Sequence, residues 1–268
     1  MAVLNLTMLF IIGTVLTHAT LIPARKLLPK RTNYAGKSVL NATGIVFVPI
    51  ILLTVLFTVS ERNGDAFVFA AYLLLAVGVG YLDDVRGDGG ARGFRGHIGA
   101  LLKGQLTTGM VKVLGLGGGA LVLGWWVFGV SISALFGAFL LAGWANLGNL
   151  FDLRPGRAIK FTMVPALPLL LLAPGWTTLA VAGVIGGIFS LFYFDVRGRI
   201  MLGDAGAAVC GSVVGLLVVS YGPGVTWIIA GLLVVSLTLV AEFSSISRFI
   251  EEVGALRWFD SWGRMRDK

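Results

Sequence analysis

Long apolar runs alternate with short polar connections along the whole chain. A helix needs about 20 mainly apolar residues to cross the hydrocarbon core of a bilayer, or about 17 when it is short. About nine segments approach this length, and they cover residues 2–22, 44–60, 66–82, 106–127, 131–149, 159–174, 176–194, 206–221 and 224–243. The pattern predicts an all-α, polytopic membrane protein with about nine transmembrane helices, formed as a single domain over residues 1–268.

Composition supports this prediction. Of the 268 residues, 57% are hydrophobic and 13% are charged, whereas soluble domains carry about 25% charged residues. The 38 glycines suit close contacts between helices in lipid. The single cysteine, Cys210, excludes a disulfide within the chain, and its surroundings lack metal-ligand spacing.

Basic residues indicate the orientation of the helices. Arg and Lys gather in the connections after the first, third, fifth, seventh and ninth segments, while the opposite connections hold only Arg62. The positive-inside rule therefore predicts that the N-terminus is outside and the C-terminus is cytoplasmic. The net charge of +8 is divided among short loops, which argues against nucleic-acid binding.

The segment 245–268 is too polar to cross a membrane. It mixes Phe, Leu and Trp with Arg and Glu, which is typical of an amphipathic helix on the inner leaflet, in one piece or in two pieces broken at Gly254. The same segment could instead fold against the mouth of a site, and its spacing does not choose between the two.

The adjacent pair Asp83-Asp84 is the leading candidate for chemistry. It follows an apolar stretch and precedes a loop rich in Gly and Arg. Two neighbouring carboxylates repel each other unless a cation or a phosphate-bearing ligand offsets the repulsion. Further carboxylates fall on the same side of the predicted bundle: Asp88, Asp152, Asp195 and Asp204. Such carboxylates among many basic residues favour a site for a hard divalent cation and a phosphate-rich substrate, although solvated loop charge is the simpler explanation for Asp88.

Two other segments offer polar groups on this side. The first cytoplasmic loop places Asn33, Lys37 and Asn41 between glycines, where they can approach a phosphate or a base. Asn146, Asn149 and Asp152 are spaced by three residues, so a continuing helix brings them to nearly one face.

Asp204 lies between Gly203 and Gly206 at the start of a predicted helix. Free backbone N–H groups at a helix N-terminus favour anions. This helix start is therefore a further candidate part of the site for a phosphate-rich substrate.

Taken in order, these motifs resemble a known superfamily. The resemblance rests on Lys37 before Gly44, Asp83-Asp84, Asn146-x-x-Asn149-x-x-Asp152 and Leu202-Gly203-Asp204-Ala205-Gly206. The set is similar to the polyprenyl-phosphate N-acetylhexosamine-1-phosphate transferases, which include the phospho-N-acetylmuramoyl-pentapeptide transferase. It covers about residues 25 to 210.

The resemblance implies a magnesium-dependent enzyme, with Mn²⁺ as an alternative ion. It implies transfer of a sugar-1-phosphate from a UDP-sugar to polyprenyl phosphate at the cytoplasmic face, with release of UMP. Such a product begins a lipid-linked envelope glycan, as in peptidoglycan or teichoic acid synthesis. A homodimer is expected by the same analogy.

The resemblance also implies roles for individual residues. Asp204 would bind magnesium, while Asp83 and Asp84 would bind the metal or prepare the lipid phosphate for attack. The substrate-binding set would comprise Asn33, Lys37, Asn41, Lys103, Asn146, Asn149 and Asp152. For Lys103, snorkelling of a basic side chain at a helix start explains its position equally well.

Three departures from the family pattern concern sugar and nucleotide recognition. A second acid after Asp152 is replaced by a segment containing Arg154 and Arg157, which either bind phosphate or anchor the loop. Met201 occupies the place of an aromatic residue that could stack on uracil, and the histidine-x-histidine loop is absent.

Other functions remain open at this stage. A catalytically degenerate homologue could bind lipid-linked intermediates or scaffold envelope synthesis. The segment from Asp84 to Arg92 approaches the motif of CDP-alcohol phosphotransferases, but its spacing differs and the second half of that motif is missing. A transporter would be expected to carry its polar residues near the membrane midplane.

Overall fold

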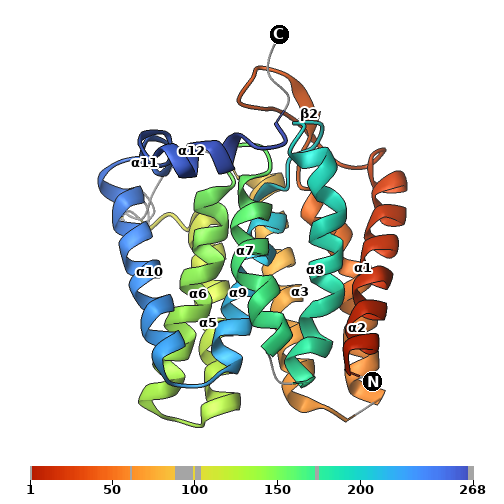
Figure 1. The fold of residues 1–268 in the computed structure, drawn as a ribbon, viewed down its shortest axis with the longest axis vertical. Helices are drawn as coiled ribbons and strands as arrows, with labels where there is room; N and C mark the ends of the chain where they lie inside the picture. Colours follow the sequence, from red (N-terminus) through yellow and green to blue (C-terminus); the bar gives the residue numbers. More distant parts are fainter. Residues whose placement is uncertain (1, 61, 88–98, 100–103, 173–174, 265–268) are drawn as a thin grey trace.

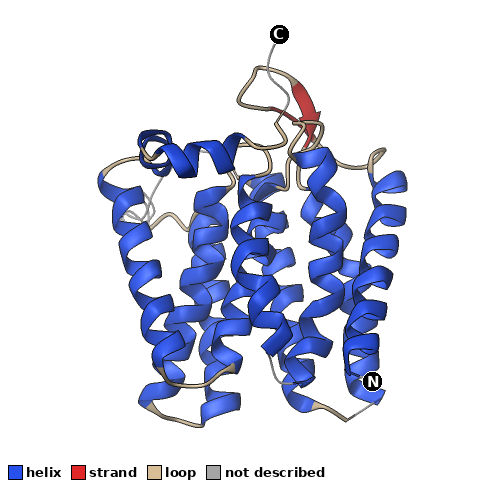
Figure 2. Cartoon of the chain, in the orientation of Figure 1, coloured by secondary structure: helices blue, strands red, loops and turns tan. Residues whose placement is uncertain are grey.

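The computed structural model describes residues 2–60, 62–87, 99, 104–172 and 175–264. Lys103 and Asp88 lie outside these residues, as does most of the segment that approaches the CDP-alcohol motif. The described chain is a bundle of helices with a small hairpin at one end (Figure 2).

Every apolar segment predicted from the sequence contains an α-helix. The helices are α1 (Ala2–Ala24), α2 (Val48–Ser60), α3 (Gly64–Arg86), α5 (Thr108–Phe128), α6 (Ile132–Phe151), α7 (Arg157–Leu172), α8 (Gly175–Asp195), α9 (Gly203–Ser220) and α10 (Val225–Phe243). A short 3₁₀ helix, η1 (Thr43–Phe47), leads directly into α2. Among the described residues, 7 helices are long and apolar enough to cross a membrane, which is compatible with a polytopic membrane protein.

Helix α9 forms the centre of the bundle. Of its residues, 89% are buried, compared with 17% for the apolar stretch of α1 at the periphery. Helices α3, α6, α7 and α8 pack around α9 (Figure 1). Because Asp204 lies in the first turn of α9, the most enclosed helix also positions a predicted site residue.

Glycine allows the helices of the bundle to approach closely. A Cβ atom added to Gly211 of α9 would lie 2.0 Å from the backbone oxygen of Trp144 in α6. A Cβ atom on Gly13 of α1 would lie 1.8 Å from the backbone oxygen of Gly183 in α8. Both contacts require glycine, as the sequence predicted for helix packing in lipid.

A two-stranded hairpin follows α1 and was not predicted. Strands β1 (Lys30–Thr32) and β2 (Ser38–Leu40) pair antiparallel, and the Asn33 side chain folds their turn by accepting hydrogen bonds from the backbone N–H groups of Ala35 and Lys37. The Met201 N–H donates to the Leu40 carbonyl oxygen over 2.7 Å, which fastens the hairpin to the segment before α9. We call this end of the bundle the hairpin end.

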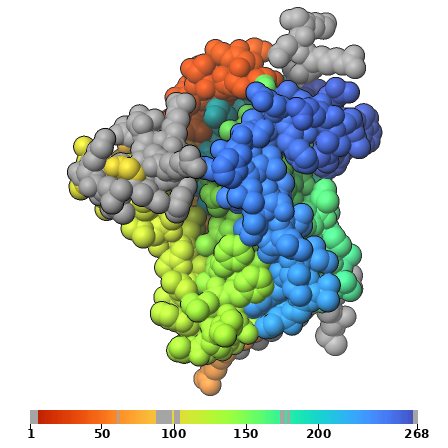
Figure 3. Space-filling view, turned by 90° about the vertical axis from the view of Figure 1, so that its left-hand side faces the viewer, coloured from red at the N-terminus to blue at the C-terminus, as the bar shows by residue number. Residues whose placement is uncertain are grey.

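The C-terminal segment crosses the hairpin end. It contains α11 (Ile246–Glu252) and α12 (Gly254–Ser261), so of the two alternatives the segment takes the one in two pieces, which are divided at Val253 just before Gly254. Figure 3 shows these helices, in deep blue, lying across the top of the bundle above α10. We call residues 246–264 the C-terminal strap.

Buried charges fasten the strap to the start of α7. Arg157 donates from Nε and Nη2 to the two carboxylate oxygens of Asp260, each over 2.8 Å, and from Nη1 to Ser247. Lys160 Nζ donates to the backbone oxygens of Phe259, Asp260 and Trp262 at the end of α12. Arg264 donates to the Pro155 carbonyl oxygen and to Asp260. The strap therefore holds the connection between α6 and α7.

Replacement of Asp260 by Asn is expected to destabilise the protein by about 3 kcal/mol at neutral pH, because it leaves the buried Arg157 without its charge partner. Burial alone would raise the pKa of Asp260. The guanidinium groups of Arg157 and Arg264 lower this pKa by more than burial raises it, so the pKa of Asp260 is below its usual value. A carboxylate with a lowered folded pKa stabilises the fold above its unfolded pKa of about 3.9 and loses that effect as pH falls through the folded pKa.

Thermal unfolding of parent and Asp260→Asn protein across the acidic range measures this effect. The difference between their midpoints should shrink steadily as pH falls below about 4. A difference that is independent of pH would show that the Asp260 charge does not stabilise the strap.

Candidate active site

Three helices bring opposite charges together at the hairpin end. Asp83 comes from the last turn of α3, Asp204 from the first turn of α9 and Lys112 from the beginning of α5. Lys112 Nζ lies 3.0 Å from Asp83 Oδ2 and donates a short hydrogen bond to Asp204 Oδ1. Thr108, one turn before Lys112, donates to Asp83 Oδ1 over 2.5 Å. We call Asp83, Lys112, Asp204 and Thr108 the Lys112 cluster.

The Lys112 cluster is partly withdrawn from solvent. The side chains of Lys112 and Asp83 are each 15% exposed, while that of Asp204 is 36% exposed. Two carboxylates face one ammonium group, which leaves one negative charge uncompensated within the cluster. Asp204 therefore forms its open edge, where a further cation or a hydrogen-bond donor can approach.

Asp84 points away from its neighbour and holds the start of α9. Its Oδ1 accepts hydrogen bonds from the Asp204 N–H over 3.0 Å and from Asn41 Nδ2 over 3.2 Å. Its Oδ2 accepts from the Ala205 N–H over 3.0 Å. The backbone N–H groups that favour an anion at the N-terminus of α9 are thus bound by Asp84 of the protein itself, and this side chain is buried.

Gly203 makes this contact sterically feasible. Its φ of +71° is in the left-handed region, and a Cβ atom added there would lie 2.5 Å from Asp84 Oδ2. Since any other residue would displace the carboxylate, the Leu202-Gly203-Asp204 motif has a structural explanation in this fold.

The first loop is joined to the same segment. Thr43 Oγ1 donates to the Met201 carbonyl oxygen over 2.8 Å. The Gly44 N–H donates to the Leu202 carbonyl oxygen over 3.0 Å. Arg31 donates to the backbone oxygen of Asp84 over 2.6 Å. The first loop, the end of α3 and the start of α9 therefore form one connected unit.

The asparagine motif is only partly gathered. Asn146 is exposed on α6, whereas Asn149 is half-buried and donates to the Ala145 carbonyl oxygen of its own helix. Asn149 Oδ1 is buried and has no hydrogen-bond partner in the described part of the chain. This oxygen is therefore available to a ligand or a cation.

Asp152 ends α6 beside a small cavity of about 40 Å³, which is also lined by Asn33, Tyr34, Arg154, Asp195 and Met201. Withdrawal from water raises the pKa of Asp152 well above its usual value, and the carboxylates of Asp195 and Asp204 raise it further. This favours the protonated form, which can donate a hydrogen bond to a ligand oxygen.

The two arginines of this connection differ in availability. Arg157 is buried against Asp260 and Ser247, so its guanidinium is already occupied. Arg154 lies at the rim of the cavity, 5.0 Å from the centre of the Tyr34 ring and 3.9 Å from Glu251. Of the pair proposed from sequence, Arg154 is the one placed to meet a phosphate.

Two of the predicted first-loop residues, Asn33 and Asn41, make hydrogen bonds that stabilise the fold. Asn33 folds the hairpin turn and also reaches the cavity. Asn41 binds Asp84 through Nδ2, and its buried Oδ1 has no hydrogen-bond partner among the described groups. Lys37 is exposed in the turn of the hairpin.

The donor chemistry of the Lys112 cluster fits magnesium. Asp83 and Asp204 provide hard carboxylate oxygens, which this ion prefers. In the part of the chain that is described, no three His, Cys, Asp or Glu side chains converge as a metal site. Magnesium is commonly bound by one or two carboxylates together with substrate phosphates, so a two-carboxylate site is consistent with an ion that arrives with a phosphorylated substrate.

Lys112 is the central residue that the sequence analysis missed. Its signal was available, because it is a charged residue inside the apolar run of α5. An ionisable residue within a membrane-spanning segment indicates a functional site by default.

No protein-family model matches the chain, and no curated protein is significantly similar to it.

Proposed function

We propose that this protein transfers a sugar-1-phosphate from a UDP-sugar to polyprenyl phosphate, with release of UMP. The convergence of Asp83 and Asp204 on Lys112 is the observation that carries the proposal. The proposal includes nine membrane-spanning helices, an outside N-terminus and a plasma-membrane location with the hairpin end in the cytoplasm. The grouping of basic residues at that end supports this orientation.

Phosphoryl transfer needs positioned charge more than covalent chemistry by the protein. A bound Mg²⁺, or Mn²⁺ in its place, would neutralise phosphate oxygens and be held by Asp204 and Asp83. Lys112 keeps the two carboxylates together and provides a positive charge beside the phosphates. Asp84 fixes the first turn of α9, and with it the position of Asp204.

The small cavity is the proposed side for the donor. Asp152 lines the cavity, and Arg154 and Tyr34 form its rim. Asn149, with its unpartnered oxygen, lies three residues before Asp152. These groups can hydrogen-bond to a sugar or base and pair with a diphosphate. Lys37 of the hairpin supplies a further cation for the phosphates.

A degenerate homologue that binds lipid-linked intermediates is the second candidate. Occupation of Arg157 by Asp260 favours it, because one proposed phosphate ligand is removed. The intact Lys112 cluster disfavours it, since binding alone does not require carboxylates held around a cation. Dimerisation remains part of the proposal by analogy with the family.

The test is release of UMP by purified protein supplied with undecaprenyl phosphate, Mg²⁺ and a panel of UDP-sugars. We expect release that depends on lipid and metal, and we expect Asp204→Asn to abolish it while the thermal midpoint stays close to that of the parent. The matched control is Asp65→Asn, because Asp65 lies in the first turn of α3, at the opposite end of that helix from Asp83. If folded parent protein releases no UMP with any UDP-sugar of the panel, the binding role would be favoured.

A further inference from the structure

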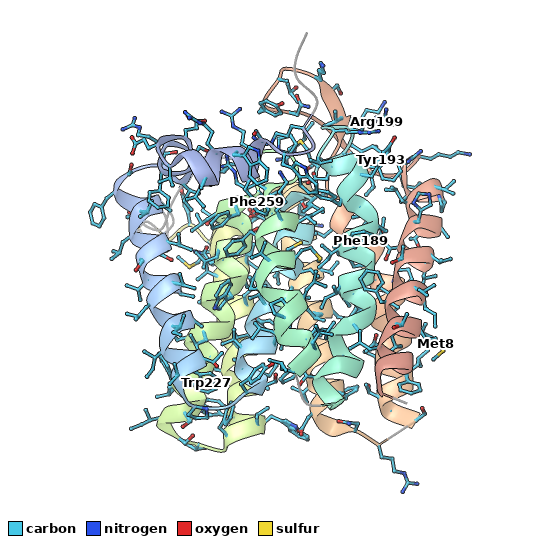
Figure 4. All side chains as sticks on the ribbon, in the orientation of Figure 1. Met8, Phe189, Tyr193, Arg199, Trp227 and Phe259 are labelled. Carbon is cyan, nitrogen blue, oxygen red and sulfur yellow. The ribbon has the colours of Figure 1, made fainter. Side chains whose placement is uncertain are left out.

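A groove opens on the outer face between α1 and α8, away from the Lys112 cluster. It has a volume of about 510 Å³, and its walls include His18, Ala19 and Ile22 of α1 and Phe189 and Tyr193 of α8. This volume lies within the range of about 300–1,000 Å³ that is usual for ligand sites. In Figure 4, Phe189 lies below Tyr193 along α8, and Arg199 lies above both at the hairpin end.

Three arginines surround the upper end of the groove. Arg197 lies 3.9 Å and Arg199 lies 5.7 Å from the centre of the Tyr193 ring. Arg25, just after α1, lies 5.3 Å from the centre of the Phe194 ring. Stacking on aromatic faces holds guanidinium groups in place and leaves their N–H donors available.

Within the described part of the chain, these arginines have no acidic partner. The ion pairs between described residues include none of Arg25, Arg197 and Arg199. The rings beneath them form a connected set, because Tyr193 contacts Phe194 and Phe194 contacts His18 in the groove wall. The apolar groove thus ends in three positively charged groups that no described carboxylate neutralises.

We infer that this groove binds an anionic phospholipid of the leaflet at the hairpin end. One acyl chain lies between α1 and α8, and the headgroup phosphate lies among Arg197, Arg199 and Arg25. Charge complementarity selects this occupant, because a zwitterionic lipid or an apolar helix face would leave the three guanidinium groups uncompensated. Groups of basic residues between helices at this depth are typical of anionic headgroup sites.

The test measures lipid retained by purified protein in native mass spectrometry, after equilibration with mixed micelles of phosphatidylglycerol and phosphatidylcholine. We expect the parent to retain phosphatidylglycerol in preference to phosphatidylcholine. The double variant Arg197→Gln/Arg199→Gln should lose about tenfold in apparent affinity for phosphatidylglycerol. The matched control, Arg248→Gln/Arg257→Gln, removes the same charge from the strap at the same end and should leave retention unchanged.

A second variant, Ala19→Trp, fills the groove without changing charge. Loss of phosphatidylglycerol retention in this variant, with a parent-like elution volume, supports the inference. Equal retention of the two lipids by the parent would overturn it, as would full retention by the double arginine variant. Conversion of a dimer to a monomer by Ala19→Trp, with lipid retention unchanged, would assign the groove to a second copy and also overturn it. None of these outcomes depends on transferase activity.

Discussion

Replacement of Lys112 by Met is expected to lower turnover by about 10²–10³-fold, the usual loss when one fixed electrostatic group is removed from an active site. Lys112 is the contact that Asp83 and Asp204 share. Without its charge the two carboxylates repel each other, and Asp204 swings toward its open side. The positive charge beside the transferred phosphate is lost as well. UMP release under saturating lipid and donor measures the effect.

The same variant should bind divalent cations at least as tightly as the parent. Lys112 competes with any cation for the two carboxylates, so its removal favours the ion electrostatically. A Mn²⁺ titration followed by electron paramagnetic resonance reads this out separately from turnover. Lys112→Arg keeps the charge but changes its shape, and it should retain more activity than Lys112→Met. Near-normal turnover of Lys112→Met would remove Lys112 from the proposed mechanism.

The helices could be predicted from sequence because lipid imposes a strong and local rule. A chain in hydrocarbon must satisfy its backbone hydrogen bonds within each segment, so apolar length alone predicts a helix. The sixth and seventh apolar segments, which lie close together in the chain, form separate helices, since α7 ends at Leu172 and α8 begins at Gly175. For the strap, the sequence left one helix or two helices open, and the structure has two, divided at Val253.

The partners of the site residues could not be predicted, since they depend on contacts between distant segments. Lys112 meets Asp83 and Asp204 only because α5 packs against α3 and α3 packs against α9. Arg157 gave the same local signal as Arg154, yet Asp260, over one hundred positions later, occupies it. The hairpin was missed because strands of 3 residues are too short to show alternation.

The fold also explains how the adjacent carboxylates of Asp83 and Asp84 are tolerated. The sequence argument required something to offset repulsion between neighbouring carboxylates. Adjacent residues of a helix point about 100° apart, so the two side chains reach different partners. Asp83 reaches an ammonium group and Asp84 reaches two backbone N–H groups and an amide. The two carboxylates therefore have separate roles: Asp83 contributes charge to the Lys112 cluster, and Asp84 holds the start of α9 in position.

Replacement of Asp84 by Asn is accordingly expected to destabilise the protein, unlike the same change at Asp83. An amide presents one acceptor oxygen, and its NH₂ group would face the Ala205 N–H or Asn41 Nδ2, which are donors themselves. Leaving a buried donor unsatisfied costs about 1–3 kcal/mol, and loss of a helix cap adds about 1 kcal/mol. A cost of about 3 kcal/mol should lower the thermal midpoint by about 6–12 °C.

Asp83→Asn provides the matched comparison, because it changes the adjacent residue by the same atoms. Lys112 keeps Asp204 as a partner in that variant, so the thermal midpoint should move much less while turnover and Mn²⁺ affinity fall. In Asp84→Asn, turnover should fall because the first turn of α9 and Asp204 lose their anchor, with Mn²⁺ affinity of the folded fraction largely retained. A parent-like thermal midpoint for Asp84→Asn, together with lost Mn²⁺ binding, would instead make Asp84 a metal ligand. Comparison of the two variants thus distinguishes the positioning role of Asp84 from the charge role of Asp83.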